Sequence, residues 1–189
     1  MENPILFDFP YSFDTERLTV RGPLPGDGKE VHTAVVESLD ELKPWMPWAV
    51  GKVLNEEQYE VRLREGQLKF LSREDLWMMP LLKGTNTIIG GCGLHRIDWN
   101  VPKFEIGYWV RTSYARQGYI TEVAASLTDF AFDTLGAKRV EIRCDSLNVR
   151  SAAIPKRLGF DHEATLRHHD RNHLTNKLRD TLVFAKVRS

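Results

Sequence analysis

The chain has 189 residues, about the length of one domain, and its 26 basic and 26 acidic residues give a formal net charge of zero. A balanced charge argues against a protein that neutralises many phosphates, because nucleic-acid-binding domains usually carry a basic excess. With 42% hydrophobic and 28% charged residues, the composition is that of an ordinary globular domain and excludes a disordered chain.

The strands predicted in chain order alternate polar and apolar residues or are continuously apolar, and cover residues 17–21, 76–82, 87–94, 104–110, 139–144, 160–166 and 180–186. The predicted helices carry an apolar stripe at helical spacing and cover residues 27–42, 55–71, 119–135 and 148–158. Asn55 is expected to cap the second helix with Gln58 as its capping-box partner. Pro80 is expected to place a bulge or an edge in its strand. This order predicts one mixed sheet with helices on both faces, an α/β (α+β) fold.

The sequence also indicates a compartment. No apolar run approaches the ~20 residues that a membrane-spanning helix needs, so no membrane partner is expected. The N-terminal residues carry Glu2 and Asp8 without the basic and apolar regions of a signal peptide. Cys92 and Cys144 stand alone in apolar segments, which favours reduced thiols over a single disulfide between them. We therefore predict a cytoplasmic protein.

One segment has a pattern that suits anion binding: the strand at 104–110 is followed by a loop, Gly118 and the start of a helix. The unpaired N–H groups at a helix N-terminus bind phosphate well, and glycine lets the backbone approach closely. A tight turn alone explains Gly118 equally well. The chain contains neither a nucleotide-triphosphatase loop nor a dinucleotide fingerprint.

Several motifs in register resemble the GNAT acetyltransferases, and most of all their ribosomal-protein N-terminal acetyltransferase branch (RimJ/RimL-like). The matching segments are residues 15–18, 42–48, 105–110, 117–122, 148–155 and 158–160. The chain departs from the family pattern at Ala115 and Ile120 in the loop. At Pro155 it lacks the tyrosine that many members use, as the RimJ/RimL-like branch commonly does.

The resemblance implies a GNAT-like single domain over residues 1–189, with a mostly antiparallel sheet of about six to seven strands and a splay between the two central strands. Residues 1–16 would form an N-terminal extension, 17–75 the first strand and the helices beside the acceptor, and 76–189 the rest of the sheet, the acetyl-CoA site and the C-terminal strands. It also implies a homodimer or a larger homo-oligomer.

The implied activity is transfer of an acetyl group from acetyl-CoA, without a metal, to the N-terminal α-amine of a protein. Acetylation of a small amine (an antibiotic, a polyamine or an amino acid) remains an alternative, and so does a catalytically silent acyl-CoA-binding module. The residues implied to bind acetyl-CoA are Trp109, Val110, Arg116, Gln117, Gly118, Tyr119, Ile120, Thr121, Asn148 and Ser151.

Two residues are candidates for catalysis. The resemblance puts Glu105 near the acetyl group as a base, although the competing interpretation is a structural carboxylate or one that simply faces solvent. Ser151 would donate a hydrogen bond to the departing thiolate, or would only cap a helix. Asn148 is expected to bind the pantetheine arm, to cap the helix, or to do both.

Aromatic residues near the first two helices are candidates for the acceptor site. Trp45, Trp48 and Tyr59 would line the acceptor pocket, or would simply pack in the core, as aromatic residues often do. His168, His169 and His173 lack the frame of a metal site and are expected in a solvated turn before the last strand.

Overall fold

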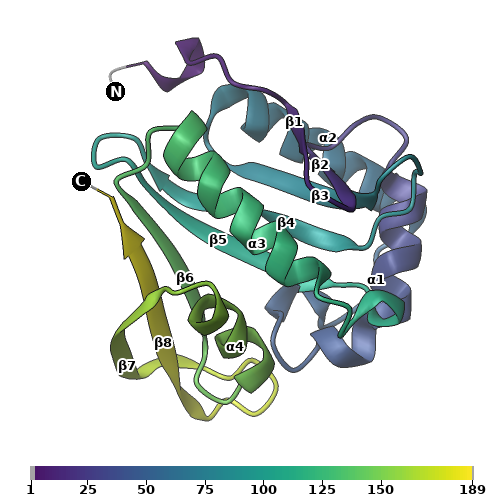
Figure 1. Ribbon diagram of the computed structural model, residues 1–189. Coiled ribbons are helices and arrows are strands. Elements are labelled where there is room, and N and C mark those ends of the chain that lie inside the picture. The colour runs from purple at the N-terminus through teal and green to yellow at the C-terminus, as the bar shows by residue number, and fades with distance from the viewer. Residues whose placement is uncertain (1–2, 189) are drawn as a thin grey trace.

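The computed structural model describes residues 3–188, and in this part of the chain eight strands form one sheet in the order β1-β2-β3-β4-β5-β6-β8-β7 (Figure 1). The strands are β1 (Ser12–Asp14), β2 (Leu18–Arg21), β3 (Leu76–Leu82), β4 (Gly90–Asp98), β5 (Lys103–Val110), β6 (Arg139–Asp145), β7 (Asp161–Arg171) and β8 (Leu178–Val187). The α-helices are α1 (Gly28–Leu42), α2 (Glu56–Ser72), α3 (Tyr119–Asp129) and α4 (Val149–Arg157). None of these helices is long and apolar enough to cross a membrane.

The predicted mixed α/β fold is confirmed, with one more strand than the upper expectation. All neighbouring strands pair antiparallel except β5 and β6, which are parallel. The unexpected strand is β1, which lies in the segment 1–16 that was predicted as an extension; residues 1–2 of that segment lie outside the described residues. Three residues are too few for a periodicity to be recognised.

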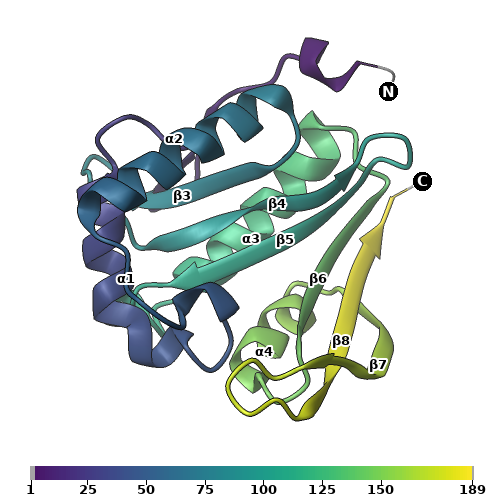
Figure 2. The same cartoon turned by 180° about the vertical axis from the view of Figure 1, so that it is seen from behind.

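The two central strands diverge. Strands β5 and β6 pair only from Lys103↔Arg139 to Glu105↔Glu141, and beyond these residues they move apart. Figures 1 and 2 show β6, β8 and β7 turning away from β5 as a separate wing of the sheet. The predicted splay therefore begins directly after Glu105.

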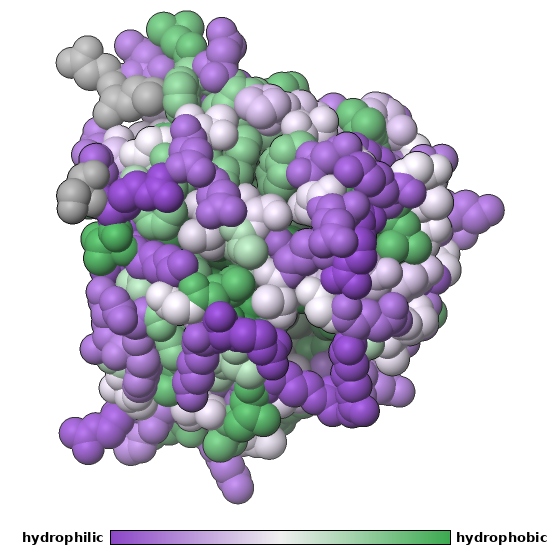
Figure 3. Space-filling view, viewed as in Figure 1, coloured by the Kyte–Doolittle hydropathy of each residue, from purple (hydrophilic) through white to green (hydrophobic). Residues whose placement is uncertain are grey.

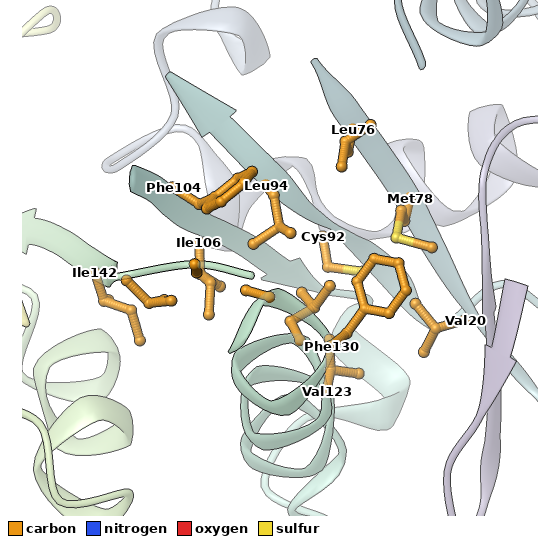
Figure 4. Packing of buried hydrophobic residues seen from close by; sticks show 14 of the residues in the cluster. Val20, Leu76, Met78, Cys92, Leu94, Phe104, Ile106, Val123, Phe130 and Ile142 are labelled. Atoms are coloured by element: carbon orange, nitrogen blue, oxygen red, sulfur yellow. The ribbon is translucent and has the colours of Figure 1, made fainter. Parts of the chain in front are cut away.

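Helices cover both faces of the sheet. Helix α3 lies across one face, and α1 and α2 lie on the opposite face (Figures 1 and 2). Figure 4 shows Val123 of α3 and Phe130, which directly follows α3, packed together with Cys92, Leu94 and other apolar side chains of the strands. A second cluster of buried residues fills the opposite face and includes Val35, Tyr59 and Leu63. On the outer surface in Figure 3, apolar groups are scattered among polar ones.

Local signals place most elements correctly. Asn55 and Gln58 form the predicted capping box: the Asn55 side chain accepts from Gln58 N at 2.8 Å, and the Gln58 side chain accepts from Asn55 N at 3.0 Å. Pro80 interrupts its strand on one side. Pairing between β3 and β4 stops at Met78, before Pro80, and after Pro80 only an isolated bridge joins Leu81 to Ile88.

Several boundaries differ from the prediction. The strand predicted at 87–94 is β4, which begins at Gly90 and ends at Asp98. The third helix stops being α-helical at Asp129 and continues as a π-helical turn over Phe130–Thr134. The last two strands extend farther than expected, so His168 and His169 lie in β7 rather than in a turn. Because β7 is an edge strand and is mostly exposed on both sides, its sequence lacks the polar–apolar alternation that reveals a strand.

Candidate functional site

Two cavities meet at β5. The larger, of about 500 Å³, lies on the face covered by α1 and α2, and we call it the helix-side cavity. The smaller, of about 290 Å³, is lined by the diverging strands β5 and β6, and we call it the splay cavity. Met46, Gly107 and Tyr108 line both, so the two cavities adjoin where the sheet opens.

The floor of the helix-side cavity is made of glycine backbone. A Cβ on Gly91 would lie 2.2 Å from Nε1 of Trp109, and one on Gly107 would lie 2.8 Å from Cδ2 of His95. The rings of Trp109 and His95 therefore lie directly over glycines, and only glycine leaves room for them. The other side chains that line this cavity are mainly aromatic or charged: Trp48, Tyr59, Arg62, Glu65, Lys69, Asp75 and Trp77.

A histidine–aspartate pair lies at this cavity and was not predicted. Nδ1 of His95 is 2.8 Å from Oδ2 of Asp75, and about a third of each side chain is exposed. Asp75 immediately precedes β3 and His95 lies on β4, twenty positions apart, so no local motif marks the pair. The antiparallel pairing of Leu76 with Leu94 brings the two residues together.

In the splay cavity, Tyr108 and Ser151 are joined by their hydroxyls. The Tyr108 hydroxyl donates to the backbone carbonyl of Ser151 at 3.1 Å, and the Ser151 hydroxyl donates to the Tyr108 oxygen at 3.3 Å. Burial raises the pKa of Tyr108, so its hydroxyl stays protonated at neutral pH. Tyr108 is a second functional candidate that sequence reasoning missed, because it sits inside a strand motif of otherwise ordinary composition.

Asn148 caps α4, as one of its two predicted roles required. Its Oδ1 accepts a hydrogen bond from Ser151 N at 3.0 Å, so the Ser151 side chain is free of the capping task. Asn148 and Ser151 both line the splay cavity. Cys144 lines it too, and burial raises the pKa of this thiol and of Cys92. Both cysteines are free, so the alternative of a disulfide is wrong.

The loop between β5 and α3, predicted as an anion-binding segment, has two successive features in its backbone that bear on this role. Gly118 is the N-cap of α3 with φ of 82°, and Arg116 also has a positive φ of 62°. No side chain caps this helix end, so its first-turn amides, which lack intrahelical acceptors, are not satisfied by a cap. The predicted positions Gln117, Tyr119, Ile120 and Thr121 flank Gly118 in this loop and turn; the Ile120 side chain itself is buried in the core.

Arg17, from the segment before β2, holds this loop from outside. Its Nη1 donates to the Gln117 carbonyl at 3.0 Å, its Nε donates to Glu122 at 2.7 Å, and its guanidinium lies 4.2 Å from the centre of the Tyr119 ring. In a trans peptide the carbonyl oxygen and the next N–H point in opposite directions. By binding the Gln117 carbonyl, Arg17 therefore sets the direction in which the Gly118 N–H points.

Glu105 lies in a chain of ion pairs at the base of the splay. Its carboxylate accepts from Arg96 at 2.9 Å and lies 3.5 Å from Arg143. Arg143 also binds the buried Glu141 at 2.7 Å, and Glu141 binds Arg139 at 2.6 Å. Two guanidiniums thus hold Glu105, and it lines the splay cavity rather than the helix-side cavity.

This ion-pair chain predicts acid sensitivity. Burial raises the pKa of Glu141, but hydrogen bonds from Arg139 and Arg143 outweigh burial and lower it overall. A lowered folded-state pKa contributes stability above the ordinary glutamate pKa, and this stability is lost as pH falls through the folded-state value. We expect the free energy of unfolding, measured with urea, to fall between about pH 5 and pH 3, and to fall less over the same range in Glu141→Gln. An equal decline in both proteins would contradict this role of Glu141.

The predicted acceptor residues divide between the cavities. Trp48 and Tyr59 line the helix-side cavity, and Trp45 lines the splay cavity. Tyr59 is also 5% exposed and packs in the core, so the core interpretation holds for it, and it lines a cavity as well. The Trp109 side chain lies in the helix-side cavity, with Trp48 edge-on at 6.0 Å between ring centres, while Val110 pairs with Gly90 at the end of β5.

The three histidines predicted in a turn are placed separately. His169 lines the splay cavity, and the His173 ring donates from Nε2 to the Lys43 carbonyl at 2.7 Å, which ties the β7–β8 hairpin to the end of α1. Among residues 3–188, no group of three or more His, Cys, Asp or Glu side chains is arranged to hold a metal ion.

Known proteins of one family are similar to this chain in sequence and in fold. The family model described as "Acetyltransferase (GNAT) domain" matches residues 17–161. A Bacillus subtilis protein named "Putative ribosomal N-acetyltransferase YdaF" is 26% identical over 163 residues, which cover 82% of this chain and 88% of that protein. The crystal structure of the microcin C7 self-immunity acetyltransferase MccE is similar with a TM-score of 0.86 and 20% identity over 95% of this chain and 98% of that one. The ribosomal-protein-S5-alanine acetyltransferase of Vibrio fischeri is similar with a TM-score of 0.83 and 19% identity over 94% of this chain and 97% of that one.

Proposed function

The chain belongs to the family of GNAT acetyltransferase domains, and from this premise we propose that it transfers the acetyl group of acetyl-CoA to the N-terminal α-amine of a protein. The observation that carries the proposal is the splay: beyond Glu105 the edge of β5 that faces β6 is unpaired and borders a cavity. The chain that leaves β5 continues to the N-terminus of α3, which no side chain caps. When bound, acetyl-CoA supplies an activated acyl group as a thioester.

The residues at the splay suit this coenzyme. The amides around Gly118 and the first turn of α3 would bind the pyrophosphate, with Arg116, Gln117, Tyr119, Ile120 and Thr121 forming the surrounding loop. Asn148 would receive the pantetheine arm through the part of its amide that does not cap α4. Backbone N–H groups near Trp109 and Val110 would stabilise the oxyanion, a kind of interaction that contributes ~2.7–4 kcal/mol to catalysis.

The splay cavity offers a group for the departing thiolate. The Ser151 hydroxyl, held by Tyr108, would donate a hydrogen bond to the sulfur. A thiol with an ordinary pKa near ~8.5 needs little help to leave, so a hydrogen bond suffices. Glu105 remains the base that the family resemblance suggests, although two arginines hold its carboxylate.

The choice of an α-amine rests on proton chemistry and on the relatives. At pH 7 deprotonating an α-amine costs about 1 kcal/mol, whereas deprotonating a lysine costs about 4.6 kcal/mol, at ~1.36 kcal/mol per pKa unit. A site with modest base strength therefore suits an α-amine better. The similar proteins include ones named as ribosomal-protein acetyltransferases, which supports a protein N-terminus as the acceptor. We also propose that the protein acts in the cytoplasm as a homodimer or larger homo-oligomer.

A thiol-release assay tests the proposed function. The protein is incubated with acetyl-CoA and, separately, with peptides that carry a free N-terminus and with a panel of polyamines, amino acids and aminoglycosides. We expect saturable thiol release with peptides. Release with small amines alone would instead make the protein a small-molecule acetyltransferase, and saturable binding of acetyl-CoA without release on any amine would make it a binding module.

Arg17 provides a prediction about the coenzyme loop. Because Arg17 orients the Gln117–Gly118 peptide, Arg17→Ala is expected to raise the KM for acetyl-CoA about three- to tenfold with little change in kcat. This change corresponds to the net contribution of about one ordinary hydrogen bond. Arg64→Ala serves as control, since Arg64 makes an exposed pair within α2. A KM that is equal in Arg17→Ala and the wild type would remove Arg17 from coenzyme binding.

A further inference from the structure

We propose that His95, oriented by Asp75, is the base that takes the proton from the acceptor amine; this inference deepens the proposed function and rests on it. The two side chains lie in the helix-side cavity, next to the point where it adjoins the splay cavity. The resemblance to the family pointed to Glu105 instead, on the neighbouring strand.

The hydrogen bond to Asp75 assigns the imidazole nitrogens. A carboxylate accepts, so Nδ1 of His95 carries the hydrogen and donates it to Oδ2 of Asp75 over 2.8 Å. The other nitrogen, Nε2, then presents a lone pair, which is what a base requires. In other enzymes, a base that is held in place by a third group in this way activates the nucleophile.

Gly107 gives this nitrogen access to the splay. A Cβ would lie 3.1 Å from Nε2 of His95 if added to Gly107 and 2.9 Å from it if added to Gly93, so the ring edge that carries the free nitrogen lies over this pair of glycines. Gly107 lies on β5 beyond the last residue that pairs with β6, and it lines both cavities. Nε2 therefore lies in the helix-side cavity beside Gly107, a residue at which this cavity adjoins the splay cavity. An amine in the helix-side cavity would meet Nε2 on its way to a thioester in the splay.

Glu105 is the alternative base, and its surroundings differ from those of His95. It is paired with His95 across β4 and β5, so both side chains start from the same part of the sheet. The Glu105 carboxylate is held by Arg96 at 2.9 Å and by Arg143 at 3.5 Å, and neighbouring positive charges stabilise a carboxylate against accepting a proton. His95 has one anionic partner, which favours the protonated ring that forms during the reaction.

Two protons leave the acceptor nitrogen during the reaction. Nε2 of His95 accepts the first from the acceptor ammonium and releases it to solvent. The neutral nitrogen then forms a bond to the carbonyl carbon of the thioester, and the C–S bond breaks with its electron pair on the sulfur. Nε2 takes the second proton from the nitrogen as the amide forms, and the thiolate leaves with a hydrogen bond from Ser151.

The charged groups around His95 bear on its pH dependence. Asp75 directly precedes β3, and Glu105 is the residue of β5 that pairs with His95. Tyr108 also lies on β5. From α2, the charged side chains that line the cavity are Arg62, Glu65 and Lys69. Of these groups, Asp75 is the one for which a direct contact with the ring is seen.

His95→Gln tests the proposal, because glutamine keeps a donor for Asp75 but has no basic nitrogen. With a peptide acceptor at about pH 7, kcat is expected to fall about a hundredfold, the usual size of a general-base effect. The defect is expected to shrink to a few-fold at about pH 9.5, where the α-amine is already neutral. Asp75→Asn is expected to show a smaller defect with the same pH dependence.

The controls separate this proposal from its premise. His162→Gln, on the outer strand β7, is expected to behave as the wild type. Acetyl-CoA affinity, measured by calorimetry, is expected to be unchanged in His95→Gln. If the wild type acetylates no peptide, the proposed function fails; if it does and His95→Gln matches it at pH 7, or is equally impaired at every pH, His95 is not the base. If Glu105→Gln, and not His95→Gln, shows a kcat defect at pH 7 that shrinks at pH 9.5, then Glu105 is the base.

Discussion

Replacing Gly118 with valine is expected to weaken acetyl-CoA binding about tenfold to a hundredfold, because a β-branched residue at positive φ costs ~1–3 kcal/mol. Space is not the obstacle, since the nearest atom to a Cβ on Gly118 is Nη2 of Arg17 at an ordinary 3.5 Å. The obstacle is the backbone conformation, because φ of Gly118 is 82°. Valine would relieve this strain by moving the peptide group at which α3 begins. The amides proposed to bind the pyrophosphate would then point elsewhere.

Gly136 provides a matched control for this experiment. It has φ of 68°, it lies between the π-helical turn and β6, and a Cβ added to it would meet no atom within 4 Å. Gly136→Val should therefore lower the thermal midpoint about as much as Gly118→Val but leave the affinity for acetyl-CoA intact. Calorimetric titration with acetyl-CoA reports the affinities. An unchanged affinity in Gly118→Val means that the loop does not bind the coenzyme.

Removing the Ser151 hydroxyl is expected to lower kcat about tenfold to a hundredfold while the KM for acetyl-CoA changes less than about threefold, because the lost hydrogen bond forms to a charge that develops only as the thiolate departs. The capping role does not interfere, since Asn148 caps α4 through the Ser151 backbone. Steady-state kinetics of Ser151→Ala measures the effect. Ser72→Ala, at the end of α2, makes the same chemical change away from the cavity.

Tyr108→Phe is expected to show a similar loss of kcat. The Tyr108 hydroxyl donates to the Ser151 carbonyl and accepts from its side chain, so both hydroxyls act as one unit. The double variant should therefore be no slower than the slower single variant. Losses that multiply in the double variant would show that the two hydroxyls act independently, and a normal kcat in Ser151→Ala would remove Ser151 from the mechanism.

The elements with a strong local signal were predicted from the sequence, and those without one were not. The capping box at Asn55 and the apolar stripe of the first helix each depend on neighbours a few residues apart. Strand β1 is too short for a periodicity, and the second half of β7, beyond the predicted residues 160–166, is too exposed to alternate. The splay was expected from the resemblance to the family rather than from any residue pattern, because it reflects where pairing between β5 and β6 stops.

The candidate site shows the same division. The loop at Gly118 and the cap at Asn148 each belong to a short motif of neighbouring residues, so both can be recognised in the sequence. The pair of Asp75 and His95, and the contact of Tyr108 with Ser151, join residues that strand pairing and helix packing bring together across 20 and 43 positions. Contacts of this kind depend on register, and a single sequence does not reveal which polar residues of two strands will face each other.

The most direct test of the central claim is the position of the acetyl group on a peptide acceptor. A peptide with a free N-terminus and no lysine, and a second peptide with a blocked N-terminus and one lysine, are mixed at equal concentration with the protein and acetyl-CoA, and fragment masses locate the modification. Acetyl transfer to an N-terminal α-amine predicts that only the first peptide gains an acetyl group, at its first residue. Modification of the lysine alone, or of neither peptide, would contradict it.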